Sequence, residues 1–154
     1  MIKLNNEHKY SIPSEYLLNS WNYTVNKFLG LESKKSLALT IVSKLDMVSI
    51  STKYYKKSLL TNILSFPFIP PSNLSLSLED KNFIGDIIIC YDVILEESKI
   101  QRKTLFSHLC HLFIHGILHL LGYDHKYSSE MKQMEYLEVS ILQKLGIDNP
   151  YILN

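Results

Sequence analysis

Apolar residues along this chain recur with two periods, one near 3.6 residues and one of two residues. The first helical pattern follows Pro13, which can occupy a first helical turn, and extends to Gly30, a residue suited to ending a helix. Two further helical patterns cover residues 104–121 and 128–145, and Gly146 follows the second of them. The pattern therefore predicts three amphipathic helices.

Three other segments have the pattern of β-strands. Residues 36–43 (SLALTIVS) alternate between apolar and polar side chains, as a strand with one buried face does. Residues 61–68 (TNILSFPF) are rich in strand-forming residues and close at Pro67, whereas residues 83–91 (FIGDIIICY) are almost continuously apolar, which is typical of a central strand. The prolines and serines of residues 67–83 predict a loop between them.

The stretch from residue 45 to residue 57 (LDMVSISTKYYKK) is ambiguous, and its apolar spacing favours a helix with a basic, tyrosine-bearing end. The resulting order is helix, strand, helix, strand, strand, helices. Because we see no internal repeat and no linker, this order predicts a single α+β domain over residues 1–154, in which a small mixed sheet is packed with helices.

Composition narrows the protein class but indicates no partner. An apolar fraction of 46% indicates a globular protein, and a formal net charge of +1 points neither to nucleic acid nor to an anionic membrane by itself. Cys90 and Cys110 form no CxxC motif, the first residues show no secretory signal, and no apolar run approaches a membrane span. We therefore expect a cytoplasmic protein without a membrane partner.

Histidines concentrate on one face of the predicted helix over residues 104–121. At about 100° per residue, four of them fall within an arc of roughly 80°: His108, His111, His115 and His119. Four aligned imidazolium groups would repel one another strongly in a half-buried position. Neutral rings bound to a metal are therefore favoured for this face.

Three histidines have the spacing of a metal site. His115 and His119 are four residues apart, which directs two ring nitrogens at one point about 2 Å from each. Gly122 allows the chain to turn back, so that His125 returns to that point, and Asp124 could orient a ligand or a bound water. Three neutral nitrogens leave one position of a tetrahedral Zn²⁺ open, as in catalytic zinc sites, and we predict one Zn²⁺ per chain.

The sequence leaves the general base open. Gly116 stands where zinc proteases of the HExxH type carry a glutamate base, and this disfavours a metallohydrolase that acts on peptides. The proton could go to His111, to Asp124 or to the substrate itself. For His108 alone or His111 alone, a core histidine bonded to a backbone carbonyl is the favoured interpretation.

The segment HGILHLLGYDH (residues 115–125) resembles the signature of the YbeY family of bacterial endoribonucleases. Residues 61–68, residues 85–90 (GDIIIC) and residues 134–151 (MEYLEVSILQKLGIDNPY) are similar to further blocks of the family, so that the resemblance covers roughly residues 36–152. It implies a zincin-like α+β fold and a zinc-dependent endoribonuclease. The implied substrate is single-stranded RNA, including the 3′ region of small-subunit ribosomal RNA, and no DNA.

The resemblance also implies site residues and a cellular role. It implies Zn²⁺ bound by His115, His119 and His125, with His111 as a further histidine beside the site. It implies a role in ribosomal RNA maturation and ribosome quality control, with the small ribosomal subunit as a partner.

One block departs from the family. The family typically has Tyr-Arg-Gly-Lys-Asp where this chain has YYKKS, so that Tyr55 takes the arginine's place and Ser58 the aspartate's. A lysine supplies only a point charge where an arginine fork holds a phosphate in two places. We expect Lys56 to act in catalysis beside His111 and Asp124.

Two functions remain after this comparison. The leading hypothesis is the endoribonuclease. The alternative is a ribosome-associated zinc-binding protein with little or no catalytic activity, which the missing arginine supports and the complete histidine set opposes.

Overall fold

The computed structural model describes residues 1–32, 34–72 and 75–152. Across these residues four strands form one sheet in the order β1-β2-β4-β3. The strands are β1 (Ile2–Asn5), β2 (Ser36–Val42), β3 (Ile63–Pro67) and β4 (Phe83–Cys90). Strand β2 runs parallel to β1 and β4, whereas β3 runs antiparallel to β4. The predicted single α+β domain with a mixed sheet is confirmed.

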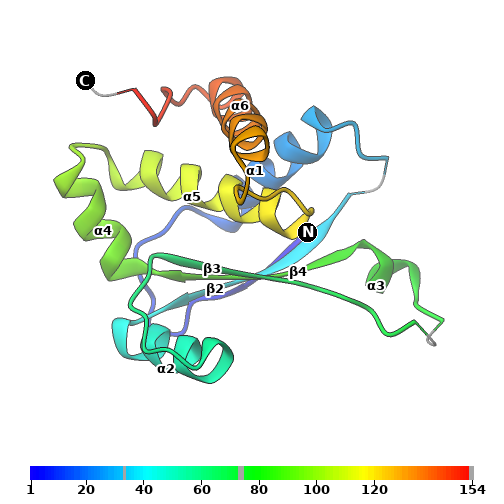
Figure 1. Cartoon of the computed structure of the whole chain (residues 1–154), viewed down its shortest axis with the longest axis horizontal. Helices are drawn as coiled ribbons and strands as arrows, with labels where there is room; N and C mark the ends of the chain where they lie inside the picture. The colour runs from blue at the N-terminus through cyan, green and yellow to red at the C-terminus, as the bar shows by residue number, and fades with distance from the viewer. Residues whose placement is uncertain (33, 73–74, 153–154) are drawn as a thin grey trace.

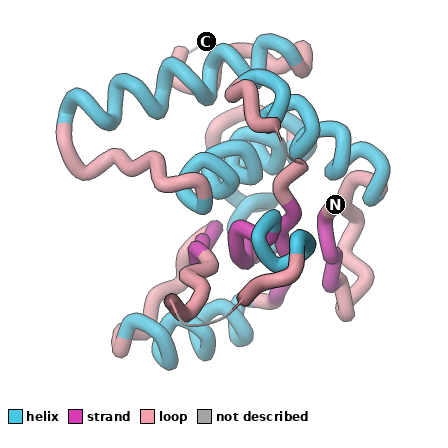
Figure 2. The backbone as a smooth tube through the Cα atoms, turned by 90° about the vertical axis from the view of Figure 1, so that its right-hand side faces the viewer, coloured by secondary structure: helices cyan, strands magenta, loops and turns pink. Residues whose placement is uncertain are grey.

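Helices cover both faces of this sheet. Within the described ranges they are α1 (Glu15–Phe28), α2 (Lys44–Tyr55), α3 (Leu78–Asn82), α4 (Tyr91–Ile100), α5 (Leu105–Leu120) and α6 (Ser128–Lys144). Helices α1, α5 and α6 lie on one side of the sheet and α2 lies on the other (Figures 1 and 2). In the part of the chain that the structure describes, no helix is both long and apolar enough to span a membrane.

Helix α5 is the centre of the larger hydrophobic core. It packs against β3 and β4 and contacts α1, α4 and α6 on its other sides. Phe113, Ile114 and Ile117 of its apolar face have no exposed surface. The helix begins after Thr104, whose hydroxyl oxygen accepts a hydrogen bond from the backbone N–H of Ser107 at 3.0 Å.

A smaller cluster lies on the opposite face of the sheet, under α2. Val42, Met47 and Cys90 are its buried members. Cys90 and Cys110 are both buried and carry free thiols. Because apolar contacts cover both faces, β4 reads in the sequence as a nearly continuous apolar run.

Three elements of the structure were not predicted, and the first helix begins later than expected. Strand β1 and helix α4 were not predicted, and α3 lies within the predicted loop over residues 67–83, of which residues 73 and 74 lie outside the described residues. The first helix begins at Glu15, not at Pro13, because the Ser14 hydroxyl accepts a hydrogen bond from the backbone N–H of Leu17.

Gly85 permits a close approach between β3 and β4. Residues 36–38 of β2 lie opposite residues 83–86 of β4, so that β4 carries one extra residue and bulges here. Gly85 has a φ of +141°, and a Cβ added to it would lie 2.2 Å from the carbonyl oxygen of Phe66. Any other residue at this position would displace β3, the strand that borders the candidate site.

We predict that Gly85→Ala lowers the free energy of unfolding by about 3 kcal/mol or more, because a positive φ and a backbone clash act together. Gly30→Ala is the matched control, since Gly30 also has a positive φ of +67° but a Cβ there would meet nothing within 4 Å. We expect Gly30→Ala to lower the free energy of unfolding by only about 1 kcal/mol. Urea unfolding of both variants measures the difference, and equal losses would contradict the steric argument.

Candidate metal centre

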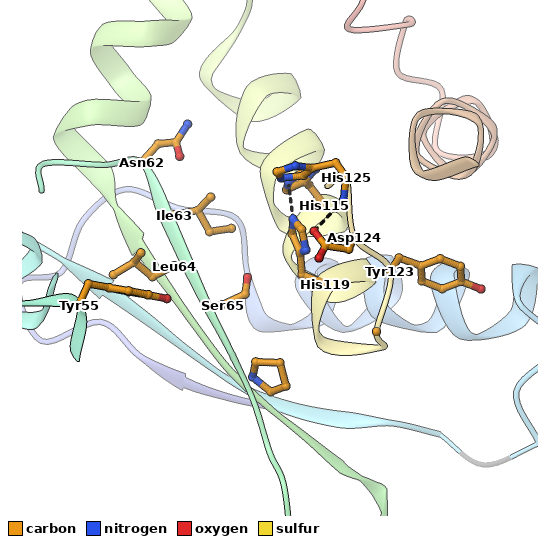
Figure 3. A pocket seen from close by; sticks show the side chains of 12 residues that line it. Tyr55, Asn62, Ile63, Leu64, Ser65, His115, His119, Tyr123, Asp124 and His125 are labelled. Carbon is orange, nitrogen blue, oxygen red and sulfur yellow. Dashed lines mark hydrogen bonds between the residues drawn. The ribbon is translucent and has the colours of Figure 1, made fainter. Parts of the chain in front are cut away.

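A cleft of about 560 Å³ lies between the C-terminal part of α5 and strand β3. Helix α5 and the loop after it form one wall, and residues from Asn62 to Pro67 form the other (Figure 3). Tyr55, the last residue of α2, lies on the side of β3 that is remote from α5. The lining residues are Tyr55, Asn62, Ile63, Leu64, Ser65, Pro67, His115, His119, Gly122, Tyr123, Asp124 and His125.

Three imidazoles converge in this cleft. The Nε2 atoms of His115 and His119, one helical turn apart on α5, are 2.9 Å from each other. One ring nitrogen from each of His115, His119 and His125 lies within 4.8 Å of the others. Nitrogens that share a metal at about 2.0–2.1 Å need to be gathered in this way. The three histidines predicted from spacing therefore form a group that could hold one metal ion.

The electrostatic environment suits a metal ligand at His119. Burial lowers the pKa of His119, and the neighbouring rings of His115 and His125 lower it further. The neutral form of the imidazole is consequently favoured in the folded protein. A metal binds this neutral form, so that fewer protons compete with the ion.

The turn after α5 returns His125 to the cleft. Gly122 has a φ of +98°, and its backbone N–H donates to the carbonyl oxygen of His119 at 3.0 Å. The next N–H, from Tyr123, donates to the carbonyl oxygen of Leu118 at 3.0 Å. The carboxylate of Asp124 then accepts from the backbone N–H of His125 at 2.7 Å. These bonds hold Asp124 and His125 in the wall of the cleft.

Gly116 has a steric role in this wall. A Cβ at this position would lie 3.0 Å from the terminal methyl carbons of Ile63 and Ile87, and 3.2 Å from Oγ of Ser65. The position therefore faces the sheet and not the metal site. A glutamate side chain would have no room there, which gives a physical reason for the absence of a base next to His115.

Glu138 is a site residue that the sequence analysis missed. Its side chain has no exposed surface, and it accepts hydrogen bonds from Nδ1 of His115, from Nε2 of His111 at 3.3 Å, and from the hydroxyl of Tyr151. Burial would raise the pKa of Glu138, but these three hydrogen bonds lower it to about 2. Burial and the adjacent Glu138 carboxylate raise the pKa of Tyr151.

A signal for Glu138 is present in the sequence. Met134, Glu138, Ile141 and Leu142 are the buried residues of α6, so that a carboxylate occupies one position of an otherwise apolar stripe. A lone acid on such a stripe indicates a buried partner. The partner itself could not be read from this spacing, because it lies on another helix.

The structure separates the other predicted site residues. His111 contacts Glu138 and lies beside a smaller cavity of about 260 Å³ near the start of α5, not in the main cleft. His108 is buried, and its Nε2 lies 3.4 Å from a carboxylate oxygen of Glu97. Its core interpretation is thus correct, although the partner is a carboxylate and not a backbone carbonyl. Lys56 is exposed at the end of α2, next to Tyr55, with a left-handed φ of +53°.

The sequence of the chain matches those of known proteins. A family model described as Endoribonuclease YbeY matches residues 3–146. Proteins named Endoribonuclease YbeY are similar to the chain: that of Alteromonas mediterranea is 39% identical over 140 residues, which are 91% of this chain and 85% of the relative. That of Colwellia psychrerythraea is 43% identical over 143 residues, 92% of this chain and 89% of the relative.

A solved structure has the same fold. The solution structure of TM1509 from Thermotoga maritima aligns with a TM-score of 0.60 and 20% sequence identity, over 95% of this chain and 92% of that one. At this identity the likeness concerns the fold alone. The family model and the curated relatives, which cover most of the sequence, carry the assignment. The chain belongs to the YbeY endoribonuclease family.

Proposed function

We propose that this protein is a zinc-dependent endoribonuclease that cleaves single-stranded RNA in the cytoplasm. Its family supplies the reaction, hydrolysis of RNA. The single observation that carries the chemistry is the convergence of His115, His119 and His125 in one cleft. We further propose that the substrate is ribosomal RNA on the small ribosomal subunit, at the 3′ end, during maturation and quality control.

The donor set fits a zinc ion, since three imidazole nitrogens with an open fourth position are typical of catalytic zinc. When bound, such an ion supplies a positive charge that can polarise a phosphate oxygen and acidify a water molecule. The chain supplies the remaining groups. His119 is favoured in its neutral form, and Asp124 lies in the wall of the cleft. We propose Asp124 as the proton acceptor, because His111 contacts Glu138 instead of the cleft.

Aromatic and basic residues near the cleft support an unpaired RNA strand as substrate. The ring of Tyr55 lines the cleft and stacks on that of Phe66, with centroids 6.0 Å apart and an interplanar angle of 27°. The ammonium of Lys53 lies 5.5 Å from the ring centroid of Tyr54. Exposed aromatic faces stack unpaired bases and lysines attract phosphates, whereas the faces of a base inside a duplex are already covered by its stacked neighbours.

A second function is a zinc-binding protein of the ribosome with little catalytic activity. The observation that favours it is Tyr55, which occupies the place of the family's arginine and brings no charge to the cleft. Lys56 is the nearest cation in sequence, and we propose that it takes part in phosphate binding. If the protein is an endoribonuclease that uses Lys56, removing the Lys56 ammonium should lower the rate of RNA cleavage. If it is a zinc-binding protein, the same change should leave that rate unaffected.

We expect the purified protein to cleave a labelled single-stranded RNA, to leave the same sequence in duplex form largely uncut, and to leave casein intact. A zinc chelator should abolish the cleavage, because the three-histidine group holds the ion that polarises the phosphate. Gel electrophoresis of all three substrates, with and without chelator, measures the outcome. Cleavage that survives the chelator would exclude the histidine group as the active centre.

Metal content tests the ligand set directly. Protein purified without added metal should contain close to one zinc ion per chain, and His119→Ala should lose most of it, since two nitrogens bind zinc far more weakly than three. His8→Ala is the control, because His8 is exposed, pairs with Asp46 and lies outside the histidine group. Elemental analysis gives the ratio, and full zinc in a His115→Ala/His119→Ala double variant would refute the assignment.

The role of Lys56 is tested by two opposite changes. Lys56→Ala should lower the initial rate on single-stranded RNA about tenfold, or about 1.4 kcal/mol in transition-state stabilisation, without releasing zinc. Tyr55→Arg, which restores the family residue, should raise the rate. Lys9→Ala is the matched control, because Lys9 is also exposed and has a left-handed φ of +55°. Unchanged rates in both test variants would favour the zinc-binding protein.

A further inference from the structure

A fully buried carboxylate lies directly behind the metal ligands. Glu138 projects from α6 toward α5 and has no exposed surface. A buried charge costs several kcal/mol unless hydrogen-bond donors compensate for the lost water. Three donors reach it, from His115, His111 and Tyr151. The donors come from α5 and from the segment after α6, so that the carboxylate joins two parts of the chain.

The contact with His115 determines which nitrogen of that ring faces the cleft. Nδ1 of His115 is in hydrogen-bond contact with a carboxylate oxygen of Glu138, and such an oxygen accepts from an imidazole N–H, so that the contact favours the neutral form with its proton on Nδ1. The lone pair of the neutral ring is then on Nε2. This is the atom that lies 2.9 Å from Nε2 of His119, at the point where the ligand nitrogens converge.

The other oxygen of Glu138 holds the C-terminal segment. It accepts from the hydroxyl of Tyr151, and His111 lies 3.4 Å from that hydroxyl. Tyr151 is 45% exposed as a residue, so that its ring is at the surface while its hydroxyl reaches inward. The ammonium of Lys103, just before α5, donates to the carbonyl oxygen of Pro150 at 3.1 Å. The segment is thereby held at Tyr151 by Glu138 and at Pro150 by the residue Lys103 before α5.

We propose that Glu138 is a positioning residue of the metal centre, and that Tyr151 completes it by closing the carboxylate off from water. Glu138 fixes the His115 ring in the orientation and protonation pattern that a metal requires. The docked C-terminal segment thus sets the affinity of the site for its metal. This inference rests on the proposed function, since it assumes that His115 is a metal ligand, and it assigns to Glu138 no contact with substrate.

A purely structural role for Glu138 makes a different prediction. If the carboxylate served only to join α5 and α6, replacing it would lower the stability of the protein but leave the His115 ring unchanged. If it positions His115, the proton distribution on that ring changes even in a variant that remains folded. The proton distribution is visible in the two-bond ¹H–¹⁵N correlation spectrum of the imidazole.

The experiment compares three variants with the wild type, as full-length protein. Glu138→Gln removes the charge at nearly constant shape, and Tyr151→Phe removes one donor at a partly exposed residue. Glu97→Gln is the control, because Glu97 also contacts a histidine, His108, that lies outside the metal site, and its other partner, the amide of Asn62, is not a metal ligand. Zinc dissociation constants are measured by competition with a chelator. The His115 spectrum is recorded on zinc-free protein at pH about 8, above the ordinary imidazole pKa of about 6.5.

We expect Glu138→Gln to weaken zinc binding by about 10- to 100-fold, the range found when a carboxylate behind a metal-bound histidine is removed. Tyr151→Phe should weaken it several-fold, and Glu97→Gln should leave it unchanged. The wild-type spectrum should show His115 protonated at Nδ1, and Glu138→Gln should shift it toward a mixture of the two neutral forms.

Zinc affinity within twofold of wild type in folded Glu138→Gln, or an unchanged His115 spectrum, would overturn the inference. If Glu138→Gln does not fold, Tyr151→Phe takes its place as the test. Wild-type zinc affinity together with a wild-type His115 spectrum in Tyr151→Phe would then overturn the inference. A wild type that binds no zinc would refute the proposed function. The zinc-free spectrum would still report whether Glu138 holds the His115 ring.

Discussion

The burial of α5 is the constraint on which the rest of the structure depends. This helix lies between the sheet and three other helices, so that ten of its 16 residues are buried. Its apolar side fills the main core, and its histidine side faces the cleft and α6. Gly116 lets the helix approach β3 and β4 until a methyl group would already be crowded. The same helix therefore holds the core together and sets the distance between the histidines and strand β3.

Four histidines on one helical face have three different environments. His115 and His119 turn into the cleft, His111 lies outside the cleft and shares the Glu138 carboxylate with His115, and His108 contacts Glu97 on α4. The position of a histidine along α5 determines its environment. Helix α4 contacts α5 at His108, whereas α6 contacts it about one turn later, at His111. A helical stripe thus predicts which residues share a face, but the partners of that face come from helices that the stripe does not contain.

Features that depend on residues close together in the sequence could be predicted, whereas strand pairings and side-chain contacts between distant segments could not. The i, i+4 spacing of His115 and His119, with Gly122 after them, was sufficient to predict a histidine group that could hold a metal ion. Strand β1 was missed because four residues with one buried side chain, Ile2, carry no period, and the strand is held by its pairing with β2. The contact of Glu138 with His115 spans 23 residues, and no local pattern encodes it.

Strand β3 is the last strand of the sheet, and its outer edge faces the cleft. The backbone groups of Asn62 and Phe68 bond to β4, so that the odd-numbered residues between them direct their N–H and C=O groups outward. The unpaired N–H and C=O groups of such an edge can form hydrogen bonds with a strand of another chain, which makes open edges prone to aggregation. Pro67 removes one outward donor from this edge. A chain that extended the sheet here would also have to fill the cleft beside the histidines and would thereby cover the candidate metal centre.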